Sequence, residues 1–133
     1  MARILVIDDD SLFRGILECC LRDRGHEVLT AEDGRSGLAI IEQSGLDLVL
    51  SDVDMPRLSG LEVGRAVALL KLGQRPPVVL MTGRPSSDVL AKAKQAGVLC
   101  VLAKPFSLAM FERALPAWLD AARPGRSSHA AAG

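Results

Sequence analysis

The amino-acid sequence predicts an α/β fold: a doubly wound sheet of five parallel strands with five helices over its two faces. Short apolar runs of strand length alternate five times with segments in which apolar residues recur at helical spacing. The runs are nearly continuous, which is typical of parallel strands buried on both faces. The chain has 133 residues, and about 30% of them are Leu, Ile, Val or Phe, enough for one domain with an apolar core.

Five apolar runs mark the predicted strands. The first (RILVI) is continuous, and the second (EVLTA) is the weakest. The strands are expected at residues 3–7, 27–31, 47–51, 76–81 and 98–103.

Helix starts and stops lie between these runs. The first helix is expected between a cap at Asp10 or Ser11 and a stop at Gly25, and the second between Asp33 and Gly45. The other three are expected at residues 61–72, 86–96 and 107 to about 122.

Helical spacing also predicts which side chains face the core. In the first helix these are Leu12, Phe13, Ile16, Leu17, Cys20 and Leu21. At the last helix, Ser107 is the expected N-cap, with Phe106 and Phe111 flanking it as a hydrophobic staple.

The net charge of zero hides an uneven distribution. Residues 1–54 carry 12 acids and 5 bases, whereas residues 55–133 carry 4 acids and 11 bases. Without a basic excess, net charge does not predict nucleic-acid binding, and no apolar stretch is long enough for a membrane span. A secretory signal is not recognisable, and Cys19, Cys20 and Cys100 form no CxxC motif, so we expect a cytoplasmic protein with three buried thiols.

Polar residues gather where the predicted strands end. In an open parallel sheet, ligands bind beyond the carboxyl ends of the strands, so these residues outline a candidate site. The residues that follow four of the strands are Asp8, Asp9, Asp10, Asp52, Asp54, Thr82 and Lys104. Five of the 16 acids are therefore expected on one rim of the sheet.

This set has the components of phosphoryl chemistry. Clustered carboxylates repel one another and gain from a cation, and oxygen ligands suit Mg²⁺. Thr82 adds a hydroxyl and Lys104 a fixed positive charge, which can steady phosphoryl oxygens. One carboxylate could act as the nucleophile, and the pattern alone leaves open which one. Each residue by itself is more often a turn, a cap or a solvated side chain, and only the coincidence on one rim favours a site.

Four segments together resemble the receiver domain of two-component response regulators. They are residues 4–10 (ILVIDDD), 47–62 (DLVLSDVDMPRLSGLE), 78–83 (VVLMTG) and 103–106 (AKPF), in the order and spacing of that family. The resemblance covers about residues 1–122. It implies a flavodoxin-like fold with strand order 2-1-3-4-5. Residues 123–133 are rich in Pro, Gly, Ser and Ala without apolar periodicity, so we expect them to form a disordered tail or linker remnant.

The resemblance implies roles for the acids on the rim. Asp52 would be the phosphoacceptor. Asp8 and Asp9 would bind Mg²⁺ (or Mn²⁺) together with Asp52, and Asp54 would contribute its backbone carbonyl. The phosphoryl donor would be a histidine kinase or a phosphotransfer protein. The chain would not be an enzyme in the ordinary sense, although it would supply the catalytic groups for its own phosphorylation and dephosphorylation.

The same resemblance assigns the remaining motif residues. Thr82 and Lys104 would bind the phosphoryl group. Pro56, Gly60 and Pro105 would be structural, with a cis bond between Lys104 and Pro105. Phosphorylation would change the face formed by the fourth helix, fifth strand and fifth helix for a downstream protein, with neither nucleic acid nor membrane as a direct partner. A homodimer through this face is a further expectation from fold analogy.

The chain departs from the family at one switch position. Most receivers carry Tyr or Phe three residues before the lysine, whereas this chain has Val101. We expect Val101 to weaken coupling between Thr82 and the output face, or to replace it with an apolar protein contact. Asp54 and Arg84 are expected to border the path of the attacking water and so to tune the lifetime of the phosphoryl group.

Two other functions compete with the switch. The sequence Asp52-Val53-Asp54 also matches the DxD nucleophile motif of haloacid dehalogenase-type phosphohydrolases, although there the motif usually follows the first strand. A binding module that has lost phosphorylation is the other alternative, but it would be expected to lack some of the acids or the lysine.

Overall fold

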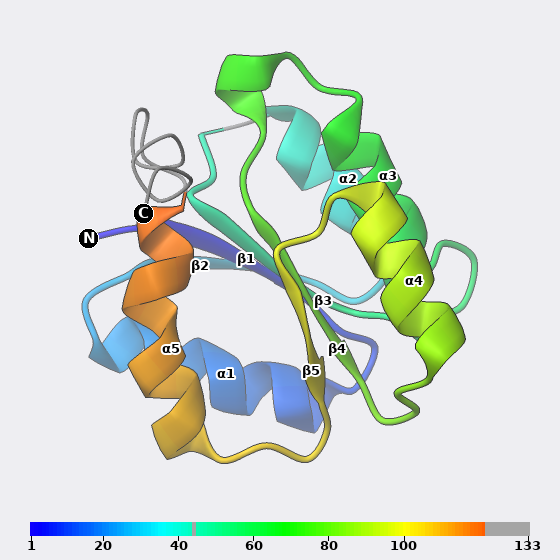
Figure 1. Cartoon of the computed structure of the whole chain (residues 1–133). Helices are drawn as coiled ribbons and strands as arrows, with labels where there is room; N and C mark the ends of the chain where they lie inside the picture. The colour runs from blue at the N-terminus through cyan, green and yellow to red at the C-terminus, as the bar shows by residue number, and fades with distance from the viewer. Residues whose placement is uncertain (44, 122–133) are drawn as a thin grey trace, which may run out of the picture.

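A computed structural model, which describes residues 1–43 and 45–121, confirms the predicted α/β architecture (Figure 1). Its strands are β1 (Arg3–Ile7), β2 (Glu27–Ala31), β3 (Leu48–Asp52), β4 (Val78–Thr82) and β5 (Cys100–Ala103). All neighbouring pairs are parallel, and the order is β2-β1-β3-β4-β5, as the resemblance implied. The predicted tail, residues 123–133, lies outside the described residues.

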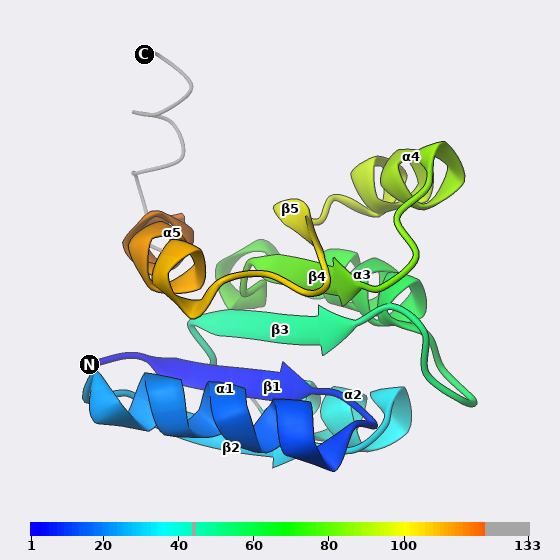
Figure 2. The same cartoon turned by 90° about the horizontal axis from the view of Figure 1, so that it is seen from below.

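Helices cover both faces of the sheet. In the described part of the chain they are α1 (Ser11–Asp23), α2 (Gly34–Gln43), α3 (Gly60–Ala68), α4 (Ser87–Ala96), α5 (Leu108–Asp120) and a short 3-10 helix, η1 (Leu72–Gln74). Helices α1 and α5 lie on one face, and α2, α3 and α4 lie on the other (Figures 1 and 2). None of these helices has the length and apolar composition needed to cross a bilayer.

Each face of the sheet has its own apolar core because side chains alternate along a strand. Toward α1 and α5, residues such as Ile4 and Val6 pack against Leu17 and Phe111. The residues of the opposite core, facing α2, α3 and α4, include Leu5, Ile7, Val49, Leu80, Ile41, Val63 and Ala93. Strands β1, β3 and β4 are therefore buried on both sides, which fixes the positions of their carboxyl ends.

Helix α3 is shorter than predicted. It ends at Ala68 rather than at residue 72, because the N–H groups of Leu69 and Leu70 bond to carbonyls three residues back and so tighten the last turn. Leu69 is 86% exposed and Leu72 is 81% exposed, so neither side chain holds a further helical turn against the sheet.

Two predictions about burial were wrong. Leu12 and Ile16 of α1 are 75% and 42% exposed, because the sheet contacts a narrower stripe of the helix than its apolar residues span. The thiols are not all buried either: Cys19 is exposed, and Cys20 and Cys100 are half-buried, although all three are free.

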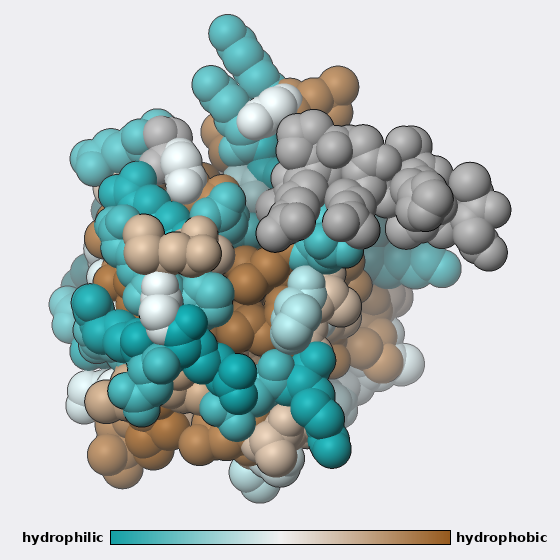
Figure 3. Space-filling view, turned by 90° about the vertical axis from the view of Figure 1, so that its left-hand side faces the viewer, coloured by the Kyte–Doolittle hydropathy of each residue, from teal (hydrophilic) through white to brown (hydrophobic). Residues whose placement is uncertain are grey.

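The side of the molecule that carries α5 and the end of α1 is mostly hydrophilic, with an apolar hollow near its centre (Figure 3). A pocket of about 500 Å³ between α5 and the residues that follow α1 is lined by residues that include Arg24, Glu112 and Leu115. The guanidinium of Arg24 and the carboxylate of Glu112 form an ion pair at 3.0 Å, so their charges join the two helices. The polar rim at the opposite ends of the strands is the better candidate for a site.

Candidate functional site

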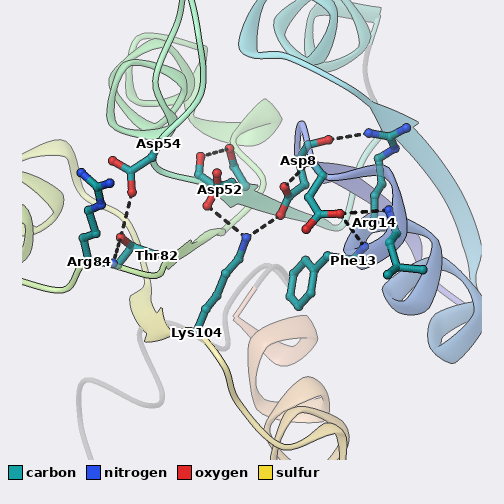
Figure 4. Close-up of polar contacts among 11 residues, drawn as sticks. Asp8, Phe13, Arg14, Asp52, Asp54, Thr82, Arg84 and Lys104 are labelled. Carbon is teal, nitrogen blue, oxygen red and sulfur yellow. Dashed lines mark hydrogen bonds and ion pairs between the residues drawn. The ribbon is translucent and has the colours of Figure 1, made fainter.

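The carboxyl ends of the strands bring the predicted residues to one edge of the sheet (Figures 2 and 4). Asp8 follows β1 and Lys104 follows β5. Asp52 and Thr82 are the last residues of β3 and β4, one residue earlier relative to the strand end than the sequence indicated. Because β3 and β4 are paired in register up to Asp52 and Met81, the two polar side chains leave the sheet at nearly the same level.

Three carboxylates form an acidic cluster. Ligand oxygens of Asp8, Asp9 and Asp52 all lie within 4.8 Å of one another. Asp8 is fully buried and Asp52 is 6% exposed, whereas Asp9 is exposed. Asp10 takes no part, because its carboxylate accepts the N–H groups of Leu12 and Phe13 as the N-cap of α1. The cluster thus has two buried acids and one that faces solvent.

Lys104 provides the positive charge within this cluster. Its Nζ lies 2.8 Å from Asp8 Oδ2 and 3.2 Å from Asp52 Oδ1. The backbone N–H of Lys104 bonds to the carbonyl of Thr82, which continues the sheet to the edge of the site. The predicted cis bond between Lys104 and Pro105 is present.

Burial and charge together set the proton affinities in the cluster. Burial raises the pKa of Asp52 from 3.8 to about 6; the neighbouring Lys104 opposes this, and Asp8 and Asp9 reinforce it. Burial alone would lower the pKa of Lys104, but hydrogen bonds and charge interactions with Asp8 and Asp52 outweigh it and raise that pKa. Three carboxylates thus lie around the ammonium group of Lys104, and an additional cation would reduce this imbalance of charge.

Thr82 and Asp54 contact each other directly. The Thr82 hydroxyl donates to Asp54 Oδ2 at 3.2 Å and accepts the backbone N–H of Arg84 at 2.9 Å (Figure 4). The hydroxyl is buried with Thr82, while Asp54 is exposed. The hydrogen of the Thr82 hydroxyl is therefore directed at Asp54 in this structure.

The other predicted residues lie around the rim. Gly60 begins α3, and a Cβ at this position would lie 2.3 Å from the backbone oxygen of Asp52, so only glycine allows this approach. Pro56 lies in the loop between β3 and α3. Val101 is half-buried in β5, where it pairs with Leu80 of β4.

Two residues at the site were not predicted there. The ring of Phe13 lies under Lys104, with Nζ 4.3 Å from the ring centroid. The guanidinium of Arg14 donates to the backbone carbonyl of Asp8. Helical spacing placed Phe13 on the core face of α1, but no local signal relates it to a lysine near the other end of the chain.

Comparison with known proteins identifies one family. Residues 4–115 match the model of the family described as response regulator receiver domain. The transcriptional regulatory protein PdtaR of Mycobacterium tuberculosis is 34% identical over 107 residues, which make up 80% of this chain and 51% of PdtaR. The chain therefore spans about half the length of that relative.

Solved structures agree with this match. The chemotaxis response regulator CheY4 of Vibrio cholerae superposes with a TM-score of 0.81 at 33% identity, covering 88% of this chain and 98% of CheY4. The receiver domain of the sensor histidine kinase PA1611 from Pseudomonas aeruginosa has a TM-score of 0.79 at 29% identity, over 89% of this chain and 97% of that one. In that structure a magnesium ion is coordinated in the active site cleft.

Proposed function

The chain belongs to the response regulator receiver domain family of two-component systems, and we propose that it is a phosphorylation-dependent switch with Asp52 as its phosphoacceptor. The observation that carries this proposal is the position of Asp52. Its carboxylate lies in a cluster with Asp8 and Asp9 and is 3.2 Å from the ammonium group of Lys104. A nucleophile, oxygen ligands for a cation and a fixed positive charge are thereby combined in one place.

These contacts support the following reaction. A carboxylate oxygen of Asp52 attacks the phosphorus of a donor phosphohistidine, a P–O bond forms, and the P–N bond breaks with its electron pair going to the leaving imidazole. Lys104 moves its hydrogen bond from Asp52 to a phosphoryl oxygen. The Thr82 hydroxyl gives up its hydrogen bond to Asp54 and donates to another phosphoryl oxygen, so it turns toward Asp52.

The acidic cluster fits a divalent cation of the Mg²⁺ or Mn²⁺ type. Its donors are all oxygens, and three carboxylates lie around the ammonium group of Lys104, which supports a site for a further cation. Asp8, Asp9 and Asp52 would hold the ion, with the backbone carbonyl of Asp54. When bound, the ion neutralises the charge on the phosphoryl oxygens.

We propose that the phosphodonor contacts α1 beside the site. The exposed apolar side chains Leu12, Ile16 and Leu108 line a groove of about 660 Å³ between α1 and the start of α5. A donor that brings a phosphohistidine to Asp52 has to cover the rim of the sheet, where α1 begins. This places the groove within the contact area of a histidine kinase or phosphotransfer protein.

This contact can be tested separately from the chemistry. Leu12→Ser should slow phosphorylation by the cognate kinase while leaving phosphorylation by acetyl phosphate unchanged. Leu69→Ser, which changes an 86% exposed leucine after α3, serves as the matched control. Equal kinase rates for the two variants would count against the α1 surface.

The output of the switch is proposed to pass through α4, β5 and α5. A phosphoryl group adds negative charge beside Thr82 and Lys104, and the end of β4 and the loop before α4 respond to it. Val101 and the exposed Leu90 and Leu99 give this face an apolar character suited to a downstream protein or to a second copy of the chain. A Val101→Tyr variant with unchanged partner binding in both phosphorylation states would contradict a role for Val101.

Free Cys19, Cys20 and Cys100 support a reducing compartment, so we place the protein in the cytoplasm. The chain would dephosphorylate itself slowly rather than turn over external substrates. The DxD motif begins at the last residue of the third strand here and not after the first, so its position gives the phosphohydrolase alternative no support.

Mass spectrometry of the intact protein after incubation with acetyl phosphate and Mg²⁺ tests the function. We expect one added phosphoryl group in the parent and none in Asp52→Asn. Asp10→Asn is the matched control, because asparagine caps a helix about as well as aspartate and Asp10 lies outside the cluster. An unmodified parent would contradict the proposal, and rapid hydrolysis of varied phosphate esters would favour a hydrolase.

A further inference from the structure

Lys104 has a third partner besides its two carboxylates. Its Nζ lies 4.3 Å from the centroid of the Phe13 ring, while Asp8 and Asp52 are 2.8 and 3.2 Å from the same nitrogen. Figure 4 shows the ring beside the lysine, across from the two carboxylates. The face of an aromatic ring carries partial negative charge and attracts a cation at this distance.

The Phe13 ring is itself held in place by other rings. Its neighbour Phe106 meets it edge-on, with centroids 5.7 Å apart and an interplanar angle of 81°. Phe106 stacks on Phe111, which is fully buried and in turn contacts Trp118. The ring under Lys104 is thus the end of a column of four aromatic side chains that reaches into the core.

We propose that Phe13 is a positioning residue that holds the Lys104 ammonium at the phosphorylation site, an inference that rests on the proposed function. In that reaction Asp52 takes the phosphoryl group and Asp8 binds a cation, so both carboxylates change partners. The ring is neither a ligand nor a reactant, and its contact with Lys104 persists through the cycle. A lysine side chain is flexible, and a constant contact keeps its charge within reach of the phosphoryl oxygens.

Fluorination separates this electrostatic role from simple packing. Fluorine atoms on a phenylalanine ring remove negative charge from its face in steps while changing its size little. Replacing Phe13 with mono-, di- and trifluorophenylalanine should slow phosphorylation by acetyl phosphate progressively, to about five- to tenfold for the trifluoro ring. Because the contact is also present before phosphorylation, the thermal midpoint of unfolding should fall slightly across the series, by no more than about 5 °C. The same series at Phe106, which lies in the column but not under the cation, is the matched control.

A second measurement examines the contact without any phosphorylation. The ring current of Phe13 should shift the Lys104 side-chain methylene protons upfield in the NMR spectrum, and Phe13→Leu should abolish this shift. Absence of the shift in the parent would overturn the inference.

The outcomes are distinguishable. A graded loss of rate at Phe13 with no loss at Phe106 supports the positioning role. Equal rates across the Phe13 series, or equal losses at both positions, overturn it while leaving the proposed function intact. A parent protein that takes no phosphoryl group refutes the proposed function, and this inference falls with it.

Discussion

Replacing Asp52 with asparagine should stabilise the metal-free protein at neutral pH. The pKa of Asp52 is raised, mainly by burial, from 3.8 to about 6. Between these two pH values the folded protein keeps a proton that the unfolded chain has released. The protonated Asp52 carboxyl contributes stability to the folded state. This contribution is fully present below pH 3.8 and is lost as the pH rises through about 6. The ionised carboxylate therefore destabilises the fold at neutral pH, and Asp52→Asn removes that cost.

The structure sets the size of this effect. Each pKa unit corresponds to about 1.4 kcal/mol, so a rise from 3.8 to about 6 amounts to at most about 3 kcal/mol. The amide is also a weaker partner than a carboxylate for Lys104, which lies 3.2 Å from Asp52. We therefore expect the stability of the variant relative to the parent to rise by about 1 to 3 kcal/mol as the pH increases from 4 to 8.

Urea unfolding in EDTA, followed by fluorescence, measures this gain. The single tryptophan of the chain, Trp118, is 7% exposed and so reports on loss of the core. Glu32→Gln, the same carboxylate-to-amide change at an exposed position, should alter the free energy of unfolding by less than about 0.5 kcal/mol at every pH. A difference between Asp52→Asn and the parent that stays constant from pH 4 to pH 8 would refute the reasoning, as would a more stable parent at pH 8.

Three further changes have defined outcomes. Asp54→Asn should lengthen the lifetime of the phosphoryl group several-fold, measured by its decay in intact mass, because an amide cannot take a proton from the attacking water; equal lifetimes would contradict this. Gly60→Ala should lower the free energy of unfolding by about 1 to 3 kcal/mol, since its Cβ would lie 2.3 Å from the Asp52 backbone oxygen, whereas Gly83→Ala, with no atom within 4 Å, should cost much less. Mg²⁺ at 100 times its dissociation constant should raise the free energy of unfolding of the parent by about 2.7 kcal/mol. Asp9→Asn at the same Mg²⁺ concentration should show a smaller rise, and an equal rise would exclude Asp9 as a ligand.

Local sequence predicted the alternation of strands and helices, and the family resemblance supplied the strand order. Apolar runs such as RILVI mark the buried strands because a strand covered on both faces needs apolar side chains in both directions. Because parallel strands end on a common edge, the sequence alone predicts one rim that carries the acids after the first and third runs, the threonine after the fourth and the lysine after the fifth. Ser107 is the N-cap of α5, as its position in the sequence predicted, and Phe106 stacks on Phe111.

Tertiary packing determined the side-chain burial and the contacts between distant residues, which local sequence patterns do not predict. The helical pattern of α1 included Leu12 and Ile16 in the core, but the sheet covers only part of that arc, so both remain exposed beside the site. No spacing rule relates Phe13 to Lys104, because the two meet only after β5 has been added at the edge of the sheet. The pKa of Asp52 is likewise a tertiary property, since it depends on burial and on charges brought in from β1 and β5. Thus the sequence determined which chemical groups share the rim, whereas the distances and burial that set their protonation and contacts exist only in the folded structure.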